Sequence, residues 1–163
     1  MTKGANCIVI YNDSFLMLLR DKISSISNPN KWCLLGGNVE EGETFDQAIE
    51  RELLEEANLK LTEYRLLGYL KGKENISALY VCYLSQDQLL KIRLGDEGQT
   101  LGFFRLDKLI DSDLVDRYAK SIKKFAPALE KLLLKENVMA SEFGLVEKDS
   151  LFNEGKTQIL SVG

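Results

Sequence analysis

The sequence predicts one domain of the α+β or α/β class. The chain has 163 residues, which is the length of a single domain that can bury a real core. Stretches with strand character surround a helical stretch rich in Glu, and a second helical stretch follows further along the chain. Strands and helices in this order are expected to pack as layers around one core.

The first part of the chain predicts three strands and a loop. The expected strands are residues 7–11, 15–20 and 32–35. Asn12 and Asp13 separate the first two strands by a turn, which indicates a hairpin. Residues 21–31 are polar and predict a loop. The third strand is expected to end at Gly36 and Gly37.

Residues 44–58 predict an amphipathic helix. Thr44 followed three residues later by Gln47 is the pattern of a capping box. A stripe expected to bury against a sheet repeats at every fourth position: Phe45, Ile49, Leu53 and Ala57. Glu52, Glu55 and Glu56 stand at i, i+3 and i+4, so their carboxylates share one face beside that stripe.

These three carboxylates predict a metal site. Like charges at this spacing destabilise an isolated helix, so a cation is expected to neutralise them. Ligand sets made only of oxygen favour hard divalent cations, which indicates Mg²⁺ or Mn²⁺. The position of the acids beside the buried stripe places them at the rim where the helix meets the sheet, within reach of a substrate.

The second part of the chain predicts further strands and a C-terminal helical region. The expected strands are residues 64–71, 76–84, 89–94 and 101–104. Residues 113–136 are amphipathic, and Pro127 is expected to divide them into two helices. Residues 143–146 and 157–162 are interpreted either as strands or as a tail that orders against a partner. The expected division is a domain of residues 1–136 and an extension of residues 137–163, which either is a tail or contacts a second copy.

Composition excludes several classes of function. Histidine is absent, which removes Ser-His and Cys-His nucleophiles and the usual zinc enzymes. The net charge is −4 with no long basic run, so neither a membrane surface nor extended nucleic acid is expected as a partner. Cys7 and Cys82 lie in apolar runs and are expected in the core. No signal peptide or membrane span is visible in the sequence, so a cytoplasmic protein is expected.

The acidic helix belongs to a longer pattern that resembles a known family. Gly37 is followed after five residues by Glu43, after seven more by Arg51-Glu52, and then by Glu55-Glu56. This is similar to the box of the Nudix hydrolases, of the MutT-like group, with Asn58 in place of the second Gly. Asn is the usual substitute for Gly where a helix ends in the left-handed conformation.

The resemblance implies a mixed sheet between helices and a metal-dependent hydrolase of pyrophosphate bonds. It implies Glu52 and Glu56 as principal metal ligands, Glu55 as a member of the cluster and the Gly36 carbonyl as a further ligand. Gly37, Glu43 and Arg51 are expected to support the box, the last two as an ion pair. Glu97 is expected as an extra carboxylate from a separate loop, with Asp96 as the alternative. Which of the acids Glu52, Glu55 and Glu97 takes the proton from water is left open.

The expected substrate is a nucleotide or another nucleoside diphosphate-linked small molecule. Lys73, Asn75 and Ile76 stand where the ADP-ribose and dinucleoside polyphosphate subfamilies carry Pro or Tyr. Glu97-Gly98-Gln99 resembles a motif of the MutT-like nucleoside triphosphate group. Nucleotide sugars and a non-catalytic nucleotide-sensing role are the alternatives. Arg20 and Trp32 are weaker candidates for contact with phosphate and base.

Overall fold

The computed structural model describes residues 1–149 and 151. Its elements in chain order are β1 (Thr2–Tyr11), β2 (Ser14–Leu19), β3 (Trp32–Cys33), β4 (Leu35–Asn38), α1 (Phe45–Ala57), β5 (Arg65–Lys71), β6 (Asn75–Tyr83), α2 (Gln86–Lys91), β7 (Thr100–Arg105), α3 (Leu106–Ile110), α4 (Asp116–Leu133) and the 3₁₀ turn η1 (Ala140–Phe143).

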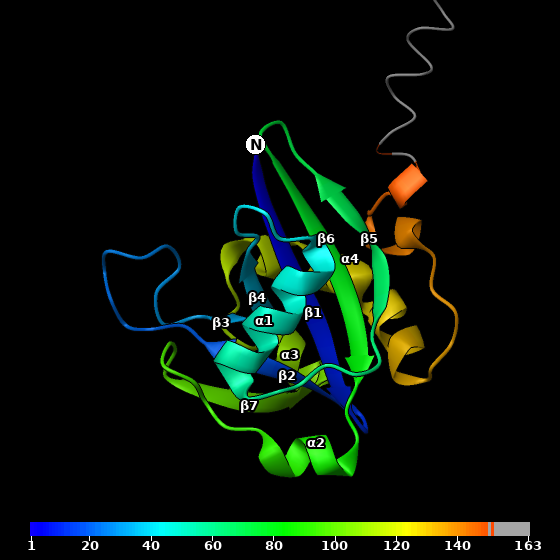
Figure 1. Cartoon of the computed structure of the whole chain (residues 1–163). Coiled ribbons are helices and arrows are strands. Elements are labelled where there is room, and N and C mark those ends of the chain that lie inside the picture. The colour runs from blue at the N-terminus through cyan, green and yellow to red at the C-terminus, as the bar shows by residue number, and fades with distance from the viewer. Residues whose placement is uncertain (150, 152–163) are drawn as a thin grey trace, which may run out of the picture.

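The strands form a seven-stranded mixed sheet (Figure 1). The order is β3-β2-β1-β6-β5, with β4 paired to β1 and β7 paired to β2. β1 and β6 are parallel, and the other pairs are antiparallel. Residues 32–35, expected as one strand, belong to two separate strands, because β3 pairs with β2 whereas β4 pairs with β1.

The sheet lies between helices, as predicted. Successive residues of a strand point to opposite faces, and β1 is apolar on both: Cys7 and Val9 pack on the α1 side, and Ile8 and Ile10 on the α4 side. Figure 1 shows α1 in front of the sheet and α4 behind it. A strand buried on both faces has a continuous apolar run in its sequence, as residues 7–10 of β1 do.

Local sequence explains α1. Thr44 accepts from the backbone N–H of Gln47, and the Gln47 side chain accepts from the backbone N–H of Thr44, so the predicted capping box is present. Ile49, Leu53 and Ala57 are fully buried, as the stripe predicts. The helix ends at Asn58, whose φ of 53° and ψ of 34° are left-handed.

The predicted strand at residues 89–94 is wrong, because the first part of this segment is the helix α2. Ser85 caps its N-terminus and forms a capping box with Gln88. A capping box satisfies two backbone N–H groups at once, and this local bonding outweighs the apolar spacing that favoured a strand. The short helix α3 was not predicted either.

The predicted break at Pro127 is also wrong, since α4 continues through it as one helix. Proline removes one helical hydrogen bond and leaves the carbonyl of Lys123 without its usual partner. Both residues lie on the exposed side of α4, where water reaches that carbonyl. Ala128, Leu129 and Leu132 are buried on the other side and hold the second half in line with the first.

Residues 140–146, the first part of the extension expected as a tail or a contact with a second copy, are packed against the domain. Ala140, Phe143 and Leu145 are buried in the same core as α4. Val146 exchanges two backbone hydrogen bonds of 2.8 Å with Tyr69 of β5, as an isolated bridge and not as a strand. Residues 157–162, the other expected strand, lie outside the described residues.

Truncation tests this packing. A chain that ends at Met139 is expected to be less stable than one that ends at Leu151, because it loses three buried apolar side chains and the bridge to Tyr69. Each large buried side chain contributes about 2–5 kcal/mol, so the loss should approach the whole stability of a domain. Urea unfolding of both chains measures it. Within the full chain, Phe143→Ala should reproduce much of the loss and the exposed Ser141→Ala should not; equal stability of the two truncations contradicts the prediction.

Candidate active site

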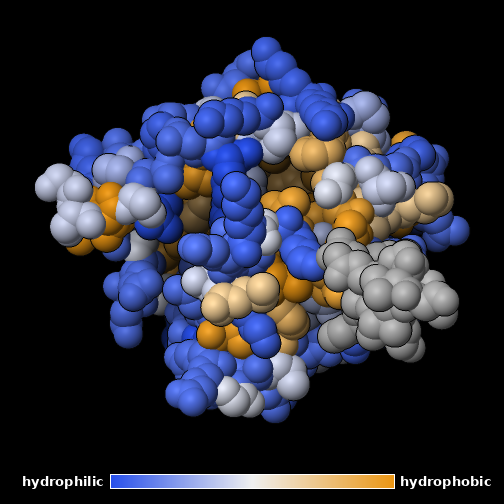
Figure 2. Space-filling view, turned by 90° about the horizontal axis from the view of Figure 1, so that it is seen from above, coloured by the Kyte–Doolittle hydropathy of each residue, from blue (hydrophilic) through white to orange (hydrophobic). Residues whose placement is uncertain are grey.

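An open cleft of about 1180 Å³ runs along the edge of α1. It is lined by β1, β4 and α1, by residues around Glu97, by the start of α4 and by the loop of residues 21–31. That loop projects at the left of Figure 1, and Figure 2 shows hollows in the surface beside it. Its apolar residues Ile23 and Ile26 also line the cleft.

Two acids of α1 face this cleft, and glycines make room for them. Glu56 accepts a 2.6 Å hydrogen bond from the backbone N–H of Gly36. Gly36 has a φ of 143°, and a side chain there would meet the carbonyl of Ala5 at 2.1 Å. A side chain on Gly37 would meet the Glu52 carboxylate at 2.5 Å. Gly37 is therefore needed for the close approach of β4 to Glu52, and Gly36 for its close approach to β1.

Arg51 ties the box together. It forms a two-pronged ion pair with Glu43, at 2.8 and 3.0 Å, and donates to the carbonyl of Asn38 at 3.0 Å. It also contacts Glu52 at 2.9 Å and Glu55 at 3.3 Å. The ion pair with Glu43 raises the pKa of Arg51 and lowers that of Glu43. The predicted ion pair is present, and it clamps the loop after β4 onto α1.

Glu97 reaches the same cleft from a separate loop. It lines the cleft together with Glu52 and Glu56, whereas Asp96 and Glu55 are not among the lining residues. The Glu55 side chain is 60% exposed, against 16% for Glu52, so the three acids of one helical face are not equivalent. The structure thus brings together two box acids and the predicted extra acid.

Electrostatics within this group favour a bound cation. Burial raises the pKa of Glu56 to about 8, against the hydrogen bond from Gly36, and the charges of Glu52, Glu97 and Glu55 raise it further. Burial also raises the pKa of Glu52, and Arg51 partly offsets this. A buried carboxylate without a cation is costly, so these residues fit a divalent cation that an oxygen-only set would hold.

Protein side chains would supply only part of the oxygen ligands of such a cation. Within residues 1–149 and 151, no three carboxylate or thiol side chains converge closely enough to hold a metal ion by themselves. Mg²⁺ characteristically keeps waters and is held by one or two carboxylates together with substrate phosphates. Two box acids beside an open cleft agree with that mode of binding.

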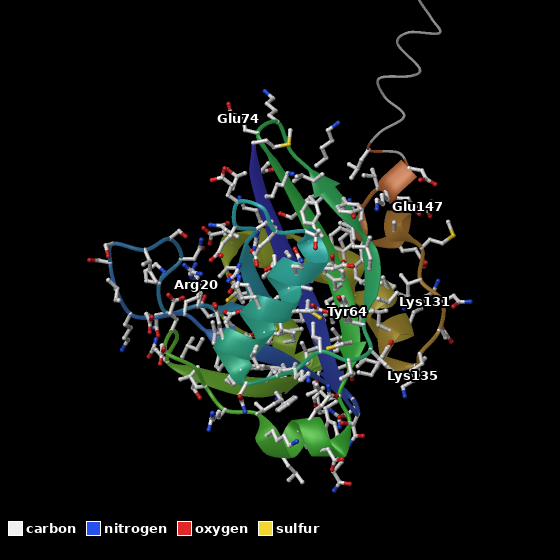
Figure 3. All side chains as sticks on the ribbon, viewed as in Figure 1. Arg20, Tyr64, Glu74, Lys131, Lys135 and Glu147 are labelled. Atoms are coloured by element: carbon white, nitrogen blue, oxygen red, sulfur yellow. The ribbon has the colours of Figure 1, made fainter. Side chains whose placement is uncertain are left out.

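The loop of residues 21–31 is fastened beside these acids. Gln99 donates to the carbonyl of Arg20 and to the side chain of Asn30, both at 2.8 Å. The backbone N–H of Gly98 donates to Asp21 at 3.2 Å. Arg20 itself donates to the carbonyl of Ser27 at 3.1 Å and lines the cleft. Figure 3 labels Arg20 at the base of the loop, beside α1.

Trp32 lies elsewhere. Its ring packs edge-on against Phe104, with ring centres 4.7 Å apart, and it is not among the residues that line the cleft. Sequence reasoning missed Arg117 and Lys120, which line the cleft from the first turns of α4. Their spacing of three residues places them on one face of an amphipathic helix, off its apolar stripe, and this is the pattern by which the sequence could have indicated them.

No helix within the described part of the chain is long and apolar enough to cross a membrane.

Comparison with known proteins identifies the family of this chain. The NUDIX domain profile matches residues 1–129. The nucleoside triphosphatase NudI of Escherichia coli is 29% identical, over 66% of this chain and 85% of that protein.

Solved structures share the fold. A mutT/nudix family protein from Listeria innocua is similar with a TM-score of 0.65 and 23% identity, over 82% of this chain and 97% of that one. The NUDIX domain of Shewanella oneidensis NrtR, solved with ADP ribose, is similar with a TM-score of 0.64 and 15% identity, over 80% and 87% of the two chains. The profile covers most of the chain and includes the acids described above, so the chain belongs to the Nudix family and is a pyrophosphohydrolase of that family.

Proposed function

We propose that this protein hydrolyses nucleoside triphosphates with Mg²⁺ or Mn²⁺ as cofactor. The observation that carries the proposal is that acidic and basic side chains line the same cleft. Glu52, Glu56 and Glu97 line it together with Arg20, Arg117 and Lys120.

The three cations are available for an anionic ligand. None of them forms an ion pair within the described residues, whereas Arg51 is occupied by the carboxylates of the box. Arg117 lies over the ring of Tyr118 at 4.8 Å and donates to its hydroxyl at 3.0 Å, which holds the guanidinium in place. Arg20 and Arg117 both act electrostatically on the Cys33 thiol, as does Glu56, so these charges surround one part of the cleft.

This arrangement suits a polyphosphate. A bound divalent cation neutralises nonbridging oxygens and makes a coordinated water more acidic. Glu52 and Glu56 would hold that cation, and Glu97 would orient or deprotonate the attacking water. Arg20, Arg117 and Lys120 would bind phosphate oxygens away from the cation, as guanidinium and ammonium groups do. Leu34, Val115, Ile23 and Ile26 also line the cleft and would offer apolar contacts to a base.

Substrate comparison tests the proposal. We expect kcat/KM to be higher for nucleoside triphosphates than for ADP-ribose, NADH or diadenosine polyphosphates, because the cleft offers three cations to a phosphate chain. A colorimetric assay of released phosphate or pyrophosphate, with Mg²⁺ or Mn²⁺, measures all four classes. A tenfold preference for ADP-ribose would overturn the triphosphate assignment and favour a sugar-linked diphosphate, the kind of ligand bound by the NrtR domain.

A further inference from the structure

Asn58 makes a contact that glycine lacks at this position of the box. Its backbone is left-handed, a conformation that Gly and Asn both adopt. Its side-chain amide Nδ2 donates to the carbonyl of Lys91 at 2.9 Å, 33 residues further along the chain. The substitution therefore keeps the backbone of the box and adds a bond to the end of α2.

That bond belongs to a ladder across the C-terminal end of α1. The backbone N–H of Arg93 donates to Ala57 at 3.1 Å, and that of Gly95 donates to Glu56 at 3.0 Å. The last carbonyls of a helix have no partner within the helix. Lys91 ends α2, and Arg93 and Gly95 follow it at every second position, so the short segment after α2 forms all three bonds with the end of α1. Two of these bonds satisfy the last carbonyls of α1, and together the three fix the position of the segment against the helix.

The ladder leads directly to the cleft. Gly95 lies so close to α1 that a side chain there would meet the carbonyl of Glu55 at 1.9 Å. Glu97 follows two residues later and lines the cleft beside Glu52 and Glu56. Because Gly95 is fixed against the helix that carries the box acids, the position of Glu97 depends on the register of this ladder.

We propose that Asn58 is a positioning residue that fixes residues 91–95 against the end of α1 and thereby holds Glu97 at the cleft. The bond to Lys91 is the rung furthest from Glu97, and it ties the ladder to α2. The consequence for turnover rests on the role of Glu97 in the proposed function. The structural consequence does not, so the two are tested separately.

Hydrogen exchange tests the structural part on metal-free protein. Asn58→Gly keeps the left-handed backbone and removes only the side-chain amide. We expect the amides of Arg93 and Gly95 to exchange about fivefold faster, the equivalent of one lost net hydrogen bond. The control is Gln88→Ala, which removes two 3.0 Å bonds of the Gln88 side chain, one to the carbonyl of Lys60 and one from the backbone N–H of Ser85, but no rung of the ladder. Unchanged exchange in Asn58→Gly, or equal acceleration in the control, overturns the proposal.

Kinetics test the route through Glu97. Asn58→Gly should lower kcat for a nucleoside triphosphate about fivefold with KM unchanged, and it should add no loss in a Glu97→Gln background. Losses that multiply in the double variant would show that Asn58 does not act through Glu97. If the wild-type chain hydrolyses no triphosphate, the proposed function fails, while the exchange measurement still decides the role of Asn58.

Discussion

Replacing Glu56 with Gln is expected to lower kcat/KM by about 100-fold or more, because Glu56 is a proposed ligand of the divalent cation and the lost contact would be worth several kcal/mol. The substitution keeps the shape of the side chain and its hydrogen bond from Gly36. Turnover should be measured with Mg²⁺ and with Mn²⁺. Glu63→Gln, an exposed acid outside the cleft, is the control. Activity that persists in EDTA, or in Glu56→Gln, excludes the metal mechanism.

The same variant is expected to be more stable than the wild type without metal. The folded-state pKa of Glu56 is about 8, well above the usual value of 4.5. The folded protein therefore holds a proton between these two pH values that the unfolded chain has released, so the free energy of unfolding falls as pH rises through this window. Gln cannot ionise and removes that fall. Thermal unfolding in EDTA at pH 5 and pH 8 measures the difference, and an equal decline in both proteins contradicts it.

Glu97→Gln is expected to lower kcat about 10- to 100-fold, the usual range for loss of a group that moves or orients a proton. The melting temperature should change little, because the side chain is exposed and forms no ion pair among the described residues. Asp96→Asn is the matched neighbour, since it removes the adjacent charge outside the cleft lining.

The two variants separate three outcomes. A loss confined to Glu97→Gln supports its role at the cleft. The reverse pattern would transfer that role to Asp96. Full activity of both would leave Glu52 and Glu56 as the acids of the site and would remove the loop from the chemistry.

The sequence by itself determined the helix α1 and its acids. Thr44, Gln47 and Asn58 define its ends by local hydrogen bonds and backbone conformation, which depend on few neighbours. The buried stripe and the acidic face follow from the period of 3.6 residues. The ion pair between Glu43 and Arg51 and the family box follow from spacing along one loop and one helix. Features of this kind depend on residues close together in the chain, so they can be predicted from the sequence.

Only the tertiary structure decided which of these residues meet. Glu55 and Glu56 are neighbours in the box, yet packing of α1 on β4 leaves Glu56 half-buried and Glu55 exposed. Trp32 packs against Phe104 and does not line the cleft. Arg117 and Lys120 line the cleft because α4 begins beside the loop of residues 21–31. The straight course of α4 through Pro127 and the docking of Phe143 depend on a core formed by distant segments. These outcomes depend on the free energy of contacts between residues far apart in the sequence, which local sequence patterns do not predict.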